Sequence, residues 1–184
     1  MEAAIDDLQE HLSRSDEIYI KHYHDKYQED FPPVWVACEI MSFGLTSRFY
    51  SNLRNYKVRR LISAAYQFDE GFLEGLLEHL TYVRNICAHH SRLWNRHFTK
   101  KMPLPKTKPS GLSENIYIDE NNKTEHKLYN TTVLLQHLIQ IISPNSDWAK
   151  RLEALINKHA IDIKRMGFPI NWKTLPLWKS ALEN

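Results

Sequence analysis

The fold of this chain is decided by residues 76–98, which run LLEHLTYVRNICAHHSRLWNRHF. Apolar side chains recur there at spacings of three and four, with an interruption at Ser91, and this is the period of an α-helix with one face toward a core. The stripe consists of Leu76, Leu80, Val83, Cys87, Trp94 and Phe98. Because Asp69 also offers an N-cap, the pattern predicts one long helix over about 70–98.

The flanking sequence has the same helical spacing, and strand alternation is scarce. Helices are predicted over about 13–28, 34–43, 46–55, 57–68, 126–143 and 147–160. Three prolines, a glycine and an Asn-Asn pair over 99–125 predict a long basic loop, with a small hairpin near 115–118. We therefore expect an all-α helical bundle that forms a single domain, 1–184, with an aromatic tail at 161–184 packed on the bundle.

The composition is that of an ordered globular chain. Of the 184 residues, 42% are hydrophobic and only 5 are glycine, which excludes a disordered segment and allows a sizeable core. The best apolar run, 133–142, is too short and too polar to span a bilayer. The glycine spacing excludes the common phosphate-binding loops. Because no signal peptide is visible, we expect a cytoplasmic protein in which Cys38 and Cys87 are free thiols.

The charges are distributed unevenly along the chain. The segment 79–113 contains no acidic residue and has a local charge of +7, although the whole chain has a net charge of only +2. Its basic residues are Arg84, Arg92, Arg96, Lys100, Lys101, Lys106 and Lys108. Such a segment indicates either an anionic partner or a solvated lysine-rich face.

Polar residues form a second stripe on the predicted long helix. Tyr82, Asn85, His89, Arg92 and Arg96 recur at spacings of three and four, and Arg84, His90 and Asn95 flank them. Histidine is able to donate or accept a proton near neutral pH, and arginine binds phosphate oxygens. These are the groups that RNA cleavage without a metal needs. Because one histidine is not easily both acid and base, the chemistry predicts a second His89 across a two-fold dimer axis.

Simpler interpretations of the same residues remain open. His89 is also compatible with a histidine that bonds a neighbouring helix, and Arg84 with a structural ion-pair partner. Asn95 and Arg96 would also suit the end of a helix, where a cation is favourable. No second Cys/His pair stands at a spacing suited to zinc, so we expect neither a metal site nor a cofactor.

The segment from Arg84 to His89 fits the R-N-x-x-x-H pattern of the HEPN superfamily, which includes metal-independent ribonucleases. The wider string, 80–96, closely resembles the Abi-like (abortive infection) bacterial phage-defence family. Pieces that resemble the same family occur in the same order elsewhere, so that the resemblance covers about 15–180. They are Ser15 with 20–23, then 33–35, 41–44, 166–169, Trp172, Pro176 and Trp178. The chain looks like a short form without the family's usual N-terminal region.

The resemblance implies a HEPN-like bundle and an endoribonuclease that leaves a 2′,3′-cyclic phosphate. It assigns the active-site positions to Arg84, Asn85 and His89. Contacts to RNA are expected from His90, Arg92, Asn95, Arg96, Lys100 and Lys101. The implied partners are RNA, a second copy in a homodimer, and a cognate antitoxin or regulatory RNA, with no membrane. Two alternatives stay open: a non-catalytic RNA-binding module and a protein-interaction or dimerisation domain.

Overall fold

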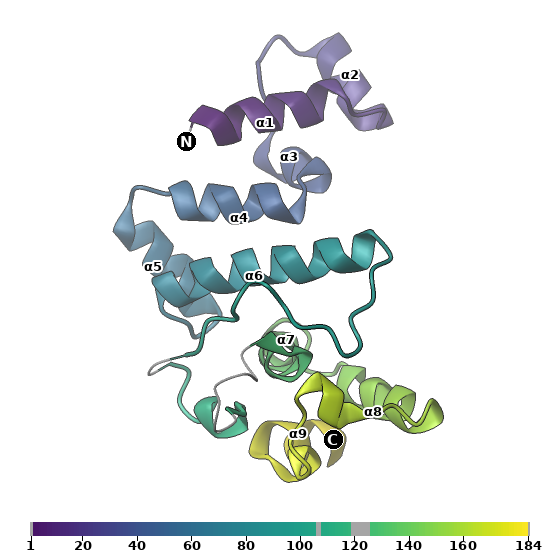
Figure 1. The fold of residues 1–184 in the computed structure, drawn as a ribbon. Helices are drawn as coiled ribbons and strands as arrows, with labels where there is room; N and C mark the ends of the chain where they lie inside the picture. The colour runs from purple at the N-terminus through teal and green to yellow at the C-terminus, as the bar shows by residue number, and fades with distance from the viewer. Residues whose placement is uncertain (1, 106–107, 119–125, 184) are drawn as a thin grey trace. The chain divides into compact units, whose positions relative to one another are not determined.

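The computed structural model describes residues 2–105, 108–118 and 126–183, and Figure 1 shows its ribbon. The chain divides into two compact units, residues 1–59 (unit N) and residues 60–184 (unit C). Every regular element among the described residues is an α-helix or a short 3₁₀-helix, which confirms the predicted all-α class. No helix in this part of the chain has both the length and the apolar character needed to cross a membrane.

Unit N is built from short amphipathic helices. They are α1 (Glu2–Ser13), α2 (Ile18–Lys26), α3 (Val34–Ile40) and α4 (Phe43–Asn52). The predictions did not include α1, although Ala4, Leu8 and Leu12 are spaced four apart and form its buried face. These three side chains pack with Ile20, Ala37 and Leu45 in one apolar cluster. The helices are held together by this cluster, since short helices are marginal alone.

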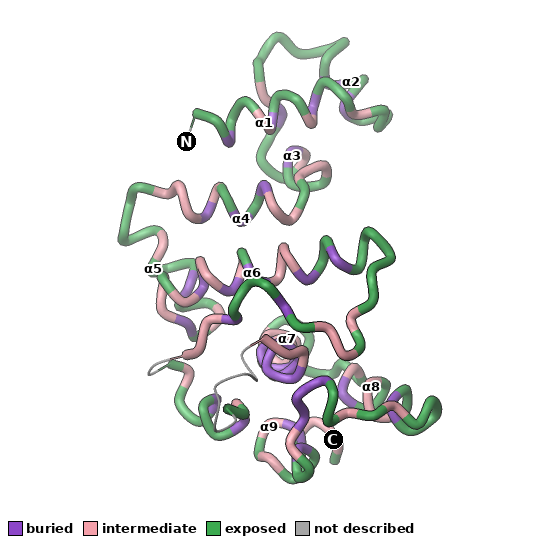
Figure 2. Tube along the Cα trace, in the orientation of Figure 1, coloured by how far each residue is buried: buried purple, intermediate pink, exposed green. Residues whose placement is uncertain are grey.

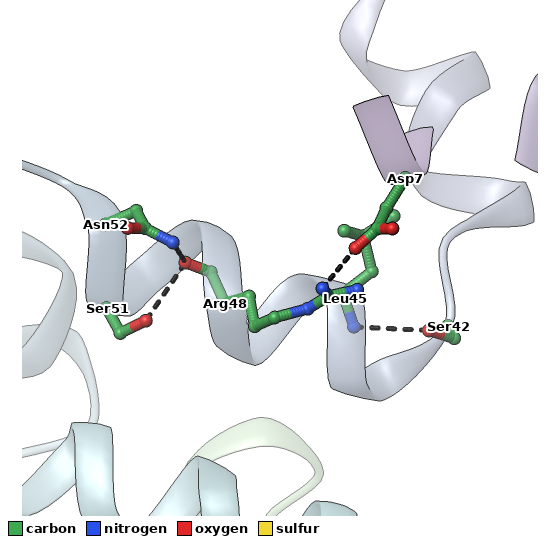
Figure 3. Close-up of polar contacts among 6 residues, drawn as sticks. All are labelled: Asp7, Ser42, Leu45, Arg48, Ser51 and Asn52. Carbon is green, nitrogen blue, oxygen red and sulfur yellow. Dashed lines mark hydrogen bonds and ion pairs between the residues drawn. The ribbon is translucent and has the colours of Figure 1, made fainter. Parts of the chain in front are cut away.

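Polar contacts between α1 and α4 supplement this packing (Figure 3). Asp7 of α1 forms an ion pair with Arg48 of α4. The Ser42 hydroxyl caps α4 by accepting a hydrogen bond from the Leu45 N–H at 3.1 Å, as an N-cap serine does. At the other end of α4, the Arg48 carbonyl accepts hydrogen bonds from the side chains of Ser51 and Asn52.

Unit C is organised around a buried helix, α7. The unit's α-helices are α5 (Tyr56–Ala65, which begins in unit N), α6 (Glu70–Ala88), α7 (Leu128–Ile142), α8 (Trp148–Lys158) and α9 (Pro176–Glu183). The 3₁₀-helices are η1 (Ser113–Asn115), η3 (Ile163–Met166) and η4 (Trp172–Thr174). Every residue from Tyr129 to Leu134 is buried, as the purple tube of α7 shows in Figure 2. A helix buried on all sides needs neighbours around it, and α8 and α9 both contact α7.

The aromatic residues of 161–184 pack against α7. Trp172 and Trp178 are almost completely buried. Their ring centres lie 5.0 Å apart, and the Phe168 ring lies 4.8 Å from Tyr129 of α7. Aromatic rings at these separations add specific contacts to the large apolar area that they bury. These tryptophans are therefore core residues of unit C.

The described part of the loop after α6 is fastened to α7 by one asparagine side chain rather than by a hairpin. The predicted hairpin near 115–118 is wrong for the described residues, because η1 ends at Asn115 and an extended segment follows. The backbone N–H and carbonyl of Tyr117 are bonded at 2.9 and 2.8 Å by the side-chain amide of Asn130. The buried amide thus replaces the partner strand that a hairpin would supply.

Candidate nucleic-acid interface

The helix that carries the candidate site ends earlier than predicted. The prediction of a helix to about Phe98 is wrong, since α6 ends at Ala88. The Ser91 N–H bonds the Ile86 carbonyl and the His90 N–H bonds the Cys87 carbonyl, both at 3.0 Å. This is the Schellman pattern of helix ends, which requires a left-handed residue after the C-cap. His90 takes that conformation, with φ of 51°.

Burial of Phe98 explains why α6 ends at Ala88. Phe98 is fully buried and packs with Val83 and Ile86 of α6. In a continuous helix Phe98 would lie about 18 Å beyond Ile86 along the axis, at 1.5 Å per residue. The chain instead reverses after α6. Burial of a phenylalanine contributes about 1.5–3 kcal/mol, which offsets a left-handed residue at roughly 1–2 kcal/mol.

The early end of α6 disperses both predicted stripes. Tyr82 and Asn85 stay on the helix and His89 is its C-cap, but Arg92 and Arg96 follow the turn and do not continue the helical face. In the apolar stripe, Cys87 is exposed and Trp94 is 38% exposed. The predicted core position of Trp94 is therefore wrong, although Leu76, Val83 and Phe98 are buried as expected.

The three predicted catalytic positions lie at the exposed end of α6. Arg84 Nη1 donates a hydrogen bond to Asn85 Oδ1 at 3.2 Å. The backbone N–H of His89 bonds the Asn85 carbonyl at 3.0 Å, one turn earlier. Side chains four apart share a helix face, so Asn85 and His89 lie on the same exposed face of α6. Within the part of the chain that the structure describes, no carboxylate forms an ion pair with Arg84. A helix C-terminus carries partial negative charge, so any phosphate bound here depends on cationic side chains.

Beyond the turn, Tyr82 is bonded to Thr99 and lies near Arg96. The Tyr82 hydroxyl accepts hydrogen bonds from the Thr99 N–H at 3.2 Å and the Thr99 hydroxyl at 3.1 Å. Burial acts to raise the pKa of Tyr82, but the Thr99 hydrogen bonds, an Arg96 hydrogen bond and the Arg96 charge outweigh it and lower the pKa below 10. Arg96 also donates to the Arg92 carbonyl at 3.5 Å. Tyr82 thus fixes the backbone at Thr99, and the half-buried Arg96 lies close enough to lower the pKa of its hydroxyl.

The other predicted RNA contacts differ in exposure and in backbone conformation. Lys100 forms an exposed ion pair with Glu78 at 3.1 Å, and such a pair is worth little when both partners stay solvated. Arg92 and Lys101 are exposed. His90 and Asn95 have positive φ angles of 51° and 53°, so each shapes the turn. The segment 89–101 is therefore a basic surface folded back beside the end of α6.

His79 is a polar residue of α6 that the sequence patterns did not single out. It is 1% exposed, and its Nε2 lies 2.9 Å from Thr131 Oγ1 of α7. Burial lowers its pKa to about 4, and the Lys100 charge acts in the same direction. A neutral imidazole therefore joins α6 to α7 at ordinary pH.

Residues 2–105, 108–118 and 126–183 hold no cluster of three or more His, Cys, Asp or Glu side chains that would suit a metal ion. Cys38 and Cys87 are exposed free thiols. The chemistry that these residues offer is accordingly that of imidazole, guanidinium and amide groups at the end of α6.

A family model described as Abi-like protein matches residues 1–95, more than half of the chain. The chain belongs to this family. Membership implies a part in abortive infection, the phage defence that gives the family its name. The match includes Arg84, Asn85 and His89 and ends at Asn95. The resemblance expected beyond residue 95 lies outside the match and stays a prediction. No curated protein and no solved structure matches the chain.

In this Abi-like protein, two interface features had no usable signal in the sequence. Trp94 fits the apolar stripe by spacing, so only the chain reversal shows that its ring is accessible. The proximity of Arg96 to Tyr82 depends on the same reversal, because the two residues do not share a helix. Both belong to the predicted polar stripe, but that stripe assumed a continuous helix and so did not predict this contact.

Proposed function

We propose that this Abi-like protein is a metal-independent endoribonuclease of the HEPN type. The observation that supports the proposal best is the set of Arg84, Asn85 and His89 at one exposed helix end. This set lies inside the segment matched by the family model. Basic residues follow it directly in the sequence, and Arg84 is held by the neighbouring amide rather than by a described carboxylate. Such a surface has donors for phosphate oxygens and an imidazole for proton transfer.

The proposed reaction is attack of a ribose 2′-oxygen on the adjacent phosphorus. A base removes the 2′-OH proton, the new P–O2′ bond forms, and the P–O5′ bond breaks as an acid protonates the leaving 5′-oxygen. The products are a 2′,3′-cyclic phosphate and a 5′-OH. His89 serves in proton transfer, Arg84 stabilises the charge on the phosphoryl oxygens, and Asn85 positions Arg84.

A second copy of the chain completes this site. A single imidazole does not act as base and acid in the same step, so a two-fold axis supplies the second His89. Arg92, Arg96, Lys100 and Lys101, with His90 and Asn95, guide the RNA strand toward the site. Specific activity is therefore expected to rise with protein concentration across the range in which the dimer forms. Size-exclusion chromatography with light scattering would define that range.

The decisive experiment is cleavage of a labelled mixed-sequence RNA in EDTA, with the product ends mapped. Wild type is expected to leave cyclic phosphate ends, and His89→Ala and Arg84→Ala are expected to lose turnover. His159→Ala is a matched control, because His159 is also an exposed histidine at a helix C-cap, that of α8. Arg151→Ala, an exposed arginine of the same helix, is the control for Arg84.

Other outcomes assign a different role. RNA that is bound but never cut, with equal affinity in wild type and His89→Ala, indicates a non-catalytic RNA-binding module. Binding through phosphates must weaken steeply between low and moderate salt. Neither cutting nor binding at any salt leaves a protein-interaction domain, with the polar surface as its docking face.

A further inference from the structure

Trp94 is an exposed tryptophan in the middle of the basic surface. It is 38% exposed, whereas Trp172 and Trp178 of the same unit are 1% and 0% exposed. It lies two residues from Arg92 on one side and two from Arg96 on the other. Leaving an indole partly in water forgoes much of its hydrophobic stabilisation. An accessible ring among cations is the composition of sites that bind single-stranded nucleic acid.

A cation distant in the sequence contacts the Trp94 ring. The guanidinium carbon of Arg165, in η3, lies 5.6 Å from the centre of this ring, which is a cation–π contact. Arg165 Nε in turn donates to Asp162 Oδ2 at 3.1 Å. The carboxylate fixes the arginine and partly offsets its charge, so that the planar guanidinium and the indole form one anchored aromatic and cationic pair. This pair links the segment after α6 to η3.

The Trp94 pair lies within reach of the proposed catalytic end of α6. Trp94 lies five positions after His89, and such a segment spans at most about 18 Å even when fully extended. His90, with φ of 51°, turns the chain within this segment, so the separation is below that limit. A short oligonucleotide is therefore long enough to contact both positions.

We propose that Trp94 and Arg165 form a stacking subsite for an unpaired nucleobase adjacent to the phosphate that Arg84 holds. The inference rests on the proposed function, since it deepens the same RNA site. A base stacks on the accessible part of the indole, and Arg165 keeps the ring in place and adds its own charge. Because a base in a duplex has both faces covered by its neighbours, the subsite selects strands whose bases are unpaired.

Binding of uncleavable probes tests the subsite apart from the chemistry. The first probe is a labelled 2′-O-methyl octa-adenylate, which has no 2′-OH to attack. The second is an octamer of the same backbone without bases. Trp94→Ala is expected to weaken octa-adenylate binding roughly 5- to 150-fold, which corresponds to about 1–3 kcal/mol. The affinity for the abasic octamer is expected to stay unchanged.

Variants distinguish stacking from a general loss of fold or charge. Trp94→Phe is expected to retain most of the adenylate affinity, and Arg165→Ala to lose part of it. Trp35→Ala is the control, because Trp35 is a 70% exposed tryptophan in unit N. The fluorescence of buried Trp172 and Trp178 reports whether each variant stays folded.

Each remaining outcome gives a definite answer. Equal affinity of wild type for both probes, together with normal RNA cleavage, refutes the subsite and leaves the nuclease proposal standing. An equal loss for both probes in Trp94→Ala also refutes stacking. If wild type binds neither probe and cuts no RNA, the proposed function fails and the subsite fails with it.

Discussion

Acidification is expected to destabilise unit C through His79. The buried imidazole has its pKa lowered from 6.5 to about 4, chiefly by burial, whereas in the unfolded chain it titrates near 6.5. Between these two values only the unfolded chain binds the proton. The stability that the neutral imidazole contributes is therefore complete above about pH 7 and is lost as the pH falls from 6.5 toward 4.

The size of this effect follows from the two pKa values. At 1.36 kcal/mol per pKa unit, the difference between 6.5 and about 4 corresponds to about 3 kcal/mol over the whole interval. About 2 kcal/mol of this is lost at pH 5. A domain of this size has a free energy of unfolding of about 5–15 kcal/mol, so the loss is large enough to measure.

The assay is urea unfolding at pH 7.5 and at pH 5.0, for wild type and His79→Gln. Emission from buried Trp172 and Trp178 follows unit C. Glutamine is able to bond Thr131 but has no proton to gain. Between pH 7.5 and pH 5, the unfolding free energy of wild type is therefore expected to fall by about 2 kcal/mol more than that of His79→Gln. Burial also lowers the pKa of His137, but this acts on both proteins and cancels in the difference.

A control separates His79 from the acid sensitivity of the whole chain. His159→Gln changes an exposed histidine and is expected to follow the wild-type pH dependence. If the wild-type and His79→Gln curves run parallel from pH 7.5 to 5.0, the imidazole does not stay neutral in the folded chain and the reasoning is refuted.

Two substitutions test the left-handed residues of unit C. Gly167 has φ of 82°, and a Cβ there would lie 2.7 Å from Lys127 Cβ, so Gly167→Ala is expected to cost about 2–4 kcal/mol and to lower the Tm. Gly71→Ala is its control: a Cβ there meets open space in helix α6, and a small gain is expected. An unchanged Tm in Gly167→Ala would contradict the close approach to Lys127. Ala160 follows the C-cap of α8 with φ of 46°, so Ala160→Gly is expected to stabilise unit C by about 0.5–1 kcal/mol. Calorimetry that shows destabilisation would argue against the left-handed conformation.

Local periodicity predicted the helices that tertiary contacts did not override. The predicted segments 126–143 and 147–160 correspond closely to α7 and α8, because apolar spacing and Pro144 are visible in the sequence itself. Helix α1 was missed even though its buried residues are spaced four apart. Acidic residues surround Ala4, Leu8 and Leu12 in the sequence, so the apolar face of α1 is inconspicuous there. It becomes evident in the structure, where α1 contacts α3 and α4.

The positions of the candidate residues along α6 were predictable from the sequence only where the helix continues. Arg84, Asn85 and His89 lie within or directly after α6, where local spacing governs, so the structure brings their backbone together as expected. Arg92, Trp94 and Arg96 lie after the reversal, where helical spacing has no meaning. Trp94 was predicted to be a core residue but is exposed. Its ring contacts Arg165, which lies 71 positions later in the sequence.

The amino-acid sequence alone determined the all-α class, the basic segment without acidic residues, and the membership in the Abi-like family, because these depend on residue types and on short spacings. Only the tertiary structure decided where α6 ends and what its last residues contact. Burial of Phe98 against Val83 and Ile86 is a contact across a chain reversal, and its free energy is of the size that offsets the left-handed turn at His90. Local helix propensity does not predict this difference between the burial of Phe98 and the cost of the turn. The burial term arises only when the folded chain removes the Phe98 ring from water.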